Sequence, residues 1–141
     1  MVPRRILRWG LTRHAALRRW ISEEAGVPWP GVAGELGAPA AWYYARAVGA
    51  DEAAVRSALA ELPRTLDRVD ALLGDGVLTP ATPTAATLQV LCSVRALEGF
   101  ADLCPQVAPR PSAAAARELF PDYPAIPAFL PPEWLTARGR G

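Results

Sequence analysis

Histidine and cysteine, the side chains that most often perform chemistry, are scarce in this chain of 141 residues. The single histidine, His14, lies in an arginine-rich segment without a recognisable partner, whereas nucleophilic catalysis requires a nucleophile beside an oriented base. We expect a partly exposed helical histidine. Cys92 and Cys104 lie about 18 Å apart along one predicted helix, which excludes a disulfide between them. These three residues do not make a metal site.

The two cysteines are also poor candidates for redox chemistry. Cys92 lies in the middle of its predicted helix, so we expect it to be buried and unreactive, as structural cysteines are. Cys104 lies at the end of that helix and is expected to reach solvent, but the negative end of the helix dipole disfavours a thiolate there.

Arg95 is the only charged residue between Leu88 and Leu97. A buried arginine is tolerated only when it is paired and hydrogen-bonded. We predict Asp67 or Asp70 as its partner, and we favour a structural role for the pair over an anion-binding site.

Arg95 belongs to the most informative element, a predicted helix over 84–104. Thr84 is suited to be its N-cap, with its hydroxyl accepting from the backbone N–H of Thr87. The helix is apolar on nearly every side, which is typical of the centre of a bundle. The sequence therefore predicts an all-α fold of about five helices around this one.

The amino-terminal part predicts a basic amphipathic helix over 4–21. Residues 1–20 contain six arginines and no acid, whereas the rest of the chain has nine arginines and fourteen acids. Binding to nucleic acid or to an anionic membrane is an alternative for this segment, although packing of its apolar side on the bundle is favoured. At 100° per residue, Arg13 falls among the apolar residues, and the polar side holds five arginines: Arg4, Arg5, Arg8, Arg18 and Arg19.

Four further elements follow from turn and capping signals. Glycines and prolines predict a loop over 26–37, in which Trp29 anchors to the core, and then a short helix over 39–48. Asp51 caps a kinked helix that continues through Pro63, with a seam of apolar residues three and four apart. One more helix is expected over 112–120. Five prolines in 121–135 predict an extended tail across the bundle.

The length is that of one domain, and we expect 1–141 to form one, with 121–141 as its tail. The sequence has no run of eighteen apolar residues and no apolar core of a secretory signal. A cytoplasmic protein is expected.

Several segments resemble the carboxyl-terminal helical domain of actinobacterial glutathione S-transferase-like proteins. They are RTLDRVDALLGDGVL (64–78), PTAATLQVLCSVRALEGFADL (83–103), RPSAAAARELFPDYP (110–124) and PAFLPPEWL (127–135), preceded by the similar 42–63 and 2–20. One departure is Thr87, where the family has an aspartate that completes the capping box, so the helix start should be weaker by about 0.5–1 kcal/mol.

The second departure concerns the thioredoxin-like domain that precedes this one in the family. That domain binds glutathione and supplies the Tyr, Ser or Cys that activates its thiol, and the sequence has no βαβ pattern and no Cys-x-x-Cys. We therefore expect a carboxyl-terminal piece of such a protein. On its own it should hold no cofactor, although glutathione is implied for the intact family fold, and it should not catalyse conjugation.

The resemblance implies a function for the aromatic residues that follow Ala41. In the family, the hydrophobic substrate site is lined by the first helices of this domain and by its tail, so Tyr43, Tyr44 and Phe129 are candidates for the wall that receives the electrophile. Packing in the core is the alternative for Trp42, Tyr43 and Tyr44. The competing function is a non-catalytic helical module that binds a partner protein, a thioredoxin-like domain or a second copy through an exposed apolar face.

Overall fold

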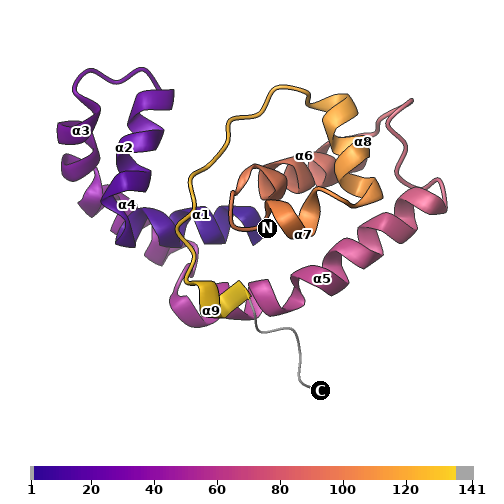
Figure 1. The fold of residues 1–141 in the computed structure, drawn as a ribbon, viewed down its shortest axis with the longest axis horizontal. Helices are drawn as coiled ribbons and strands as arrows, with labels where there is room; N and C mark the ends of the chain where they lie inside the picture. The colour runs from indigo at the N-terminus through magenta and orange to yellow at the C-terminus, as the bar shows by residue number, and fades with distance from the viewer. Residues whose placement is uncertain (1, 136–141) are drawn as a thin grey trace. The chain divides into compact units, whose positions relative to one another are not determined.

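The computed structural model describes residues 2–135, and over that range the ordered structure is helical (Figure 1). The all-α prediction is confirmed for these residues, and an isolated β-bridge between Phe100 and Ile126 is the only strand-like pairing among them. The chain forms two compact units, whereas the sequence predicts one domain. Unit 1 is Met1–Leu59 with Phe129–Gly141, and unit 2 is Ala60–Ala128. The last six residues of the predicted tail, 136–141, lie outside the described residues.

Unit 1 contains four helices, the first eight of the 23 residues of a fifth and a short carboxyl-terminal one, whereas unit 2 contains the rest of the fifth and three more. In chain order they are α1 (Val2–Arg13), α2 (Ala15–Glu24), α3 (Pro30–Leu36), α4 (Ala38–Ala47), α5 (Glu52–Gly74), α6 (Ala85–Gly99), α7 (Cys104–Val107), α8 (Pro111–Leu119) and α9 (Pro132–Leu135).

The basic segment predicted as one helix over 4–21 forms α1 and α2, so that prediction is wrong in its middle. His14 separates the two helices with φ −120° and ψ 107°, an extended conformation. The bend brings the Leu17 side chain against Gly10, so closely that a methyl group at position 10 would lie 2.8 Å from it. In a straight helix, residues 10 and 17 would lie about 10 Å apart along the axis, which is too far for this contact. The apolar residues of the segment, Ile6, Trp9 and Leu17, are buried as predicted.

Arg18 is the main departure from the predicted polar side, because it is buried inside unit 1. Its Nε donates to the carbonyl of Gly34 at 2.8 Å, and its Nη1 donates to the carbonyl of Leu11 at 2.9 Å. Both carbonyls belong to the last turns of helices, α3 and α1, where intrahelical donors are missing. The Arg18 side chain therefore donates hydrogen bonds to carbonyls at the carboxyl ends of both α1 and α3.

The segment predicted as a loop over 26–37 contains α3, which packs beside α2 (Figure 1). The helix forms because Pro30 occupies its first turn, where its fixed φ and missing N–H are tolerated. Trp29 precedes it with a left-handed φ of 54° and is 81% exposed, so the prediction that it anchors to the core is wrong. Gly34 lets α3 lie close to α2, since a Cβ at position 34 would lie 3.1 Å from the backbone nitrogen of Arg19.

The end of α4 and the start of α5 lie where the capping signals predict them, and the apolar seam predicted for α5 is largely buried. Helix α4 ends before Gly49, whose φ of +60° is in the left-handed region that glycine tolerates. Asp51 caps α5, because its Oδ1 accepts from the backbone N–H of Ala54 at 2.7 Å. Helix α5 continues through Pro63 to Gly74. Its seam is buried at the first four positions, which are Val55, Leu59, Leu62 and Leu66.

In unit 2, α6 begins as the sequence predicts and ends earlier. The Thr84 hydroxyl accepts from the backbone N–H of Thr87 at 3.2 Å. The predicted end at Cys104 is wrong, since Phe100 turns to ψ 119° and continues away from the helix axis. The turn lets the tail pair there: Ile126 donates its N–H to the carbonyl of Gly99 at 2.8 Å, and Ala101 donates to Ile126 at 3.0 Å.

Helix α6 is also less enclosed than a bundle centre. It buries Thr87, Leu91, Val94 and Leu97 on one face, whereas Leu88 and Cys92 on the other are exposed. The prediction of a helix shielded on all sides is therefore wrong, because α7, α8 and the tail cover only part of its circumference in unit 2.

Replacing Arg18 with alanine should leave the carbonyls of Leu11 and Gly34 buried without donors, which we expect to destabilise unit 1 by about 2–4 kcal/mol. All five tryptophans lie in unit 1, so urea denaturation followed by tryptophan fluorescence measures this unit. The control is Arg19→Ala, because Arg19 neighbours Arg18 on α2 and is exposed. Equal destabilisation by the two substitutions would contradict the assignment.

Candidate functional site

The aromatic residues of α4 lie on the surface of unit 1. Trp42, Tyr43 and Tyr44 are 60%, 65% and 51% exposed, whereas Ala41 and Ala45 of the same helix are buried. Packing in the core, the alternative for these aromatic residues, is therefore wrong, because the small alanines occupy the inward face of α4. The rings of Tyr43 and Tyr44 contact each other edge to face with their centres 5.8 Å apart. The guanidinium of Arg8 lies 4.9 Å from the centre of the Tyr44 ring.

Phe129, the third predicted wall residue, lies on the other side of α1. Its ring occupies the space beside Gly10, where a methyl group would come within 2.4 Å of it, and its centre is 5.7 Å from that of the His14 ring. Gly10 is two residues after Arg8, which contacts Tyr44, and positions two apart on a helix point about 200° apart. The structure thus brings Tyr43 and Tyr44 together and places Phe129 in the packing of α1.

A groove with a volume of about 700 Å³ opens in unit 1 at the ends of α1 and α4 and the start of α5. We call it the α1–α4 groove. Two arginines, two tryptophans and two carboxylates line it, together with smaller residues: Arg13, Arg46, Trp9, Trp42, Asp51 and Glu52.

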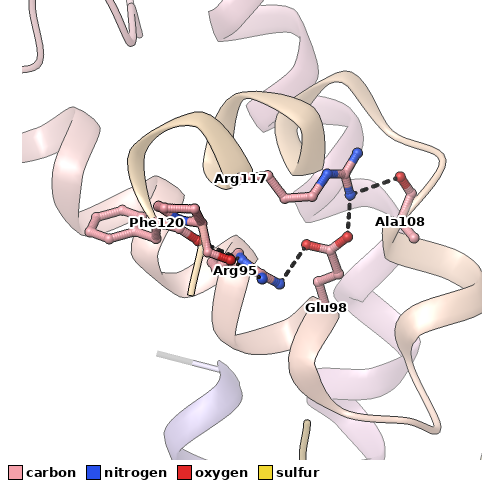
Figure 2. Close-up of polar contacts among 6 residues, drawn as sticks. Arg95, Glu98, Ala108, Arg117 and Phe120 are labelled. Carbon is pink, nitrogen blue, oxygen red and sulfur yellow. Dashed lines mark hydrogen bonds and ion pairs between the residues drawn. The ribbon is translucent and has the colours of Figure 1, made fainter. Parts of the chain in front are cut away.

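The predicted pairing of Arg95 with Asp67 or Asp70 is wrong. In unit 2, Arg95 binds Glu98 at 3.0 Å and donates to the carbonyls of Phe120 and Pro121 at 2.8 and 3.0 Å (Figure 2). The reason is position, because Arg95 faces the carboxyl end of α8 and the two aspartates face its amino end. Glu98 is buried and is also bound by Arg117, so its carboxylate joins two arginines.

Asp67 and Asp70 instead bind Arg110, which donates to each carboxylate at 2.8 Å. Asp70 also accepts from the backbone N–H of Ser112 at 2.9 Å. Ser112 is in the first turn of α8, so a carboxylate on α5 caps that helix in place of a local side chain. Partial burial raises the pKa of Asp70, but the hydrogen bonds from Ser112 and Arg110 outweigh it and leave this pKa below its ordinary value.

The remaining candidates do not form a reactive cluster. Cys92 is exposed, which corrects the prediction of a buried thiol, and Cys104 is half-buried in the first turn of α7. Burial raises the pKa of the nearby Tyr123 hydroxyl; Cys92 also raises it, and Arg95 opposes both. His14 is half-buried between the rings of Trp9 and Phe129. In residues 2–135 no three histidine, cysteine, aspartate or glutamate residues gather as a metal site would require.

No protein-family model, curated protein or solved structure matches the chain. The resemblance to glutathione S-transferase-like proteins therefore stays a prediction. None of the helices between residues 2 and 135 combines the length and the apolar character needed to cross a bilayer.

Sequence reasoning missed the α1–α4 groove and the two-arginine site of Glu98. The sequence contained one indication of the groove, because Arg13 falls on the apolar side of its helix. The Glu98 site had another, since Arg95 and Glu98 are three residues apart and adjacent on a helix face. Arg117 and Arg110 had no local signal, because their partners are 19 and at least 40 residues away in the chain.

Glu98→Ala should leave Arg95 and Arg117 without their shared buried carboxylate. We expect a loss of about 2–4 kcal/mol in the free energy of unfolding of unit 2. Urea denaturation measures it when far-UV circular dichroism, which follows the helices of both units, is compared with tryptophan fluorescence, which follows unit 1. The matched control is Glu118→Ala, at an exposed position of α8, and a Glu98→Ala protein as stable as this control would refute the role of Glu98.

Asp70→Ala should lower stability at pH 7 by about 1–2 kcal/mol, the range for a lost helix cap. A carboxyl group whose pKa is lower in the folded state stabilises the fold above its unfolded pKa, near 3.8, and ceases to do so as the pH falls through the folded value. The difference between wild type and Asp70→Ala should therefore shrink below about pH 3.8. Denaturation at pH 7 and pH 3 tests this.

The control for this experiment is Asp67→Ala. Asp67 binds the same Arg110, but its side chain is 68% exposed, so we expect it to contribute less than about 1 kcal/mol. A difference between wild type and Asp70→Ala that does not depend on pH would contradict the ionised carboxylate as the cap of α8.

Proposed function

We propose that this chain is the helical domain of a glutathione S-transferase-like protein, and that α4 provides the wall against which the hydrophobic electrophile binds. The observation that carries the proposal is the exposure of Tyr43 and Tyr44 on a helix whose alanines face inward. Aromatic rings have a large apolar area that is normally buried. Two neighbouring exposed rings are therefore suited to contact an apolar ligand.

The start of α6 also supports the proposal. The segment that carries much of the family resemblance contains Thr84, and its hydroxyl caps the helix there. Among the residues that the resemblance gave for the wall, Tyr43 and Tyr44 remain candidates, whereas Phe129 packs on α1. The reaction of the intact family is attack of a glutathione thiolate on an electrophilic carbon, and the groups that bind and activate glutathione would come from a thioredoxin-like domain.

A second candidate, a non-catalytic module that binds a partner protein, is favoured by the extent of exposed apolar side chains in unit 1. Besides the aromatic residues of α4, Trp29, Val32 and Leu36 of the α3 region are exposed, the last by 77%. Exposed apolar patches commonly mark interaction sites. Sedimentation velocity over a range of concentrations distinguishes self-association from a monomer.

The proposal predicts that a hydrophobic electrophile binds at α4 without reacting. With 1-chloro-2,4-dinitrobenzene as the probe, Tyr43→Ala and Tyr44→Ala should each weaken binding about three- to tenfold, the value of one aromatic contact. Protein NMR titration measures the affinity. In the presence of glutathione, the chain should leave the rate of conjugation at that of buffer, because it supplies no group that activates the thiol.

The matched control is Trp29→Ala, which removes an exposed aromatic residue outside α4 and should leave the affinity unchanged. A wall at α4 is ruled out if Trp29→Ala weakens binding as much as the tyrosine variants do. Retention of the chain on immobilised glutathione, with elution by free glutathione, would show that the glutathione-binding groups are not on another domain.

A further inference from the structure

The α1–α4 groove has the size of a small-molecule site. Its volume of about 700 Å³ lies within the range of about 300–1,000 Å³ that is usual for ligand pockets. All of the residues that line it belong to unit 1. Helix α4 contributes Trp42, Ala45 and Arg46 to it, which lie three and four residues apart and so share one face of the helix.

Neither arginine of the groove forms an ion pair within residues 2–135. Both carboxylates are already engaged, because Asp51 accepts from the N–H of Ala54 and Glu52 pairs with Arg56 at 2.8 Å. Arg46 lies over the ring of Trp42, with 5.8 Å between its guanidinium carbon and the ring centre. Arg13 is exposed in the last turn of α1. An anion can therefore pair with these two guanidinium groups, and a guanidinium can bind a carboxylate with two parallel hydrogen bonds.

The same groove exposes one indole ring, that of Trp42. Trp42 is 60% exposed, whereas Trp9, which also lines the groove, is buried and contacts Trp134 at a tilt of 45° with ring centres 4.8 Å apart. An indole ring favours a planar partner in offset or edge-to-face contact. The exposed ring and the charges together fit a ligand that has an aromatic body and an anionic group.

The helix dipole gives a simpler reason for a cation at each of these positions. Arg13 and Arg46 are both in the last turns of their helices, where positive charge is favourable. The helix dipole explains why both residues are cationic, but it does not explain why both side chains line the groove. Arg13 lies on the apolar side of its helix, and this position directs it toward the groove that Trp42 and Arg46 also line.

We propose that the α1–α4 groove binds a small planar organic anion, an aromatic carboxylate or a molecule of the same character. Its anionic group is held by Arg13 and Arg46, and its ring lies against Trp42. Neither Tyr43 nor Tyr44 lines the groove, and the site does not depend on the function proposed above.

The probe is 2-naphthoate, and its neutral counterpart of the same shape is 2-naphthamide. We expect 2-naphthoate to shift the indole N–H signal of Trp42 in protein NMR at low salt and to bind at least about tenfold more tightly than 2-naphthamide, because only the anion forms charge-assisted hydrogen bonds with the arginines. Arg13→Gln and Arg46→Gln should each weaken 2-naphthoate about five- to tenfold and leave 2-naphthamide unchanged.

The control is Arg5→Gln, which removes the same charge from an exposed position of α1 outside the groove. It should leave the affinity for 2-naphthoate unchanged, and equal weakening by Arg5→Gln and Arg13→Gln would overturn the proposal. Equal affinity of wild type for the two probes would also overturn it, and this comparison needs no variant. Shifts at Trp29 without shifts at Trp42 would place the probe elsewhere and have the same consequence.

Discussion

Both units depend on an arginine that reaches inward to bind backbone carbonyls at the carboxyl ends of helices. In unit 1, Arg18 joins the last turns of α1 and α3. In unit 2, Arg95 binds the carbonyls of Phe120 and Pro121, which follow α8. The last carbonyls of a helix lack donors and carry partial negative charge. A guanidinium satisfies both needs at once, and this is why buried cations are tolerated in units with few other polar groups inside.

The need for donors to terminal carbonyls is greatest in short helices. Excluding the long α5, the helices of residues 2–135 have between 4 and 15 residues, so a large share of their carbonyls lies in terminal turns. All fifteen cationic residues are arginine. A lysine ammonium at position 18 would act as one compact charge, whereas the planar fork of arginine reaches two carbonyls in different helices. Helix α8 shows the complementary device, because Asp70 binds its amino end and Arg95 its carboxyl end.

The sequence predicted the features that local chemistry determines. The caps at Thr84 and Asp51, the end of α4 at Gly49 and the seam of α5 all depend on residues within one or two turns of each other. The bend at His14 was missed because the amphipathic pattern of 4–21 continues through it. Helix α3 was missed because glycine and proline in 26–37 are typical of a loop. The partners of Arg95 and Asp70 were missed for another reason, since 25 to 42 residues separate the interacting groups.

The two units use their charged side chains differently, and this difference decides which unit has a candidate binding site. Unit 2 engages its charged side chains with one another: Glu98 binds two arginines, and Arg110 binds two carboxylates. Unit 1 instead leaves aromatic rings on α4 exposed and has arginines stacked on them, Arg8 on Tyr44 and Arg46 on Trp42. A guanidinium above a ring still has its N–H groups directed outward in its own plane, where an anion can accept from them. Ligand binding is therefore expected at the surface of unit 1, and the polar contacts of unit 2 serve to hold its short helices together.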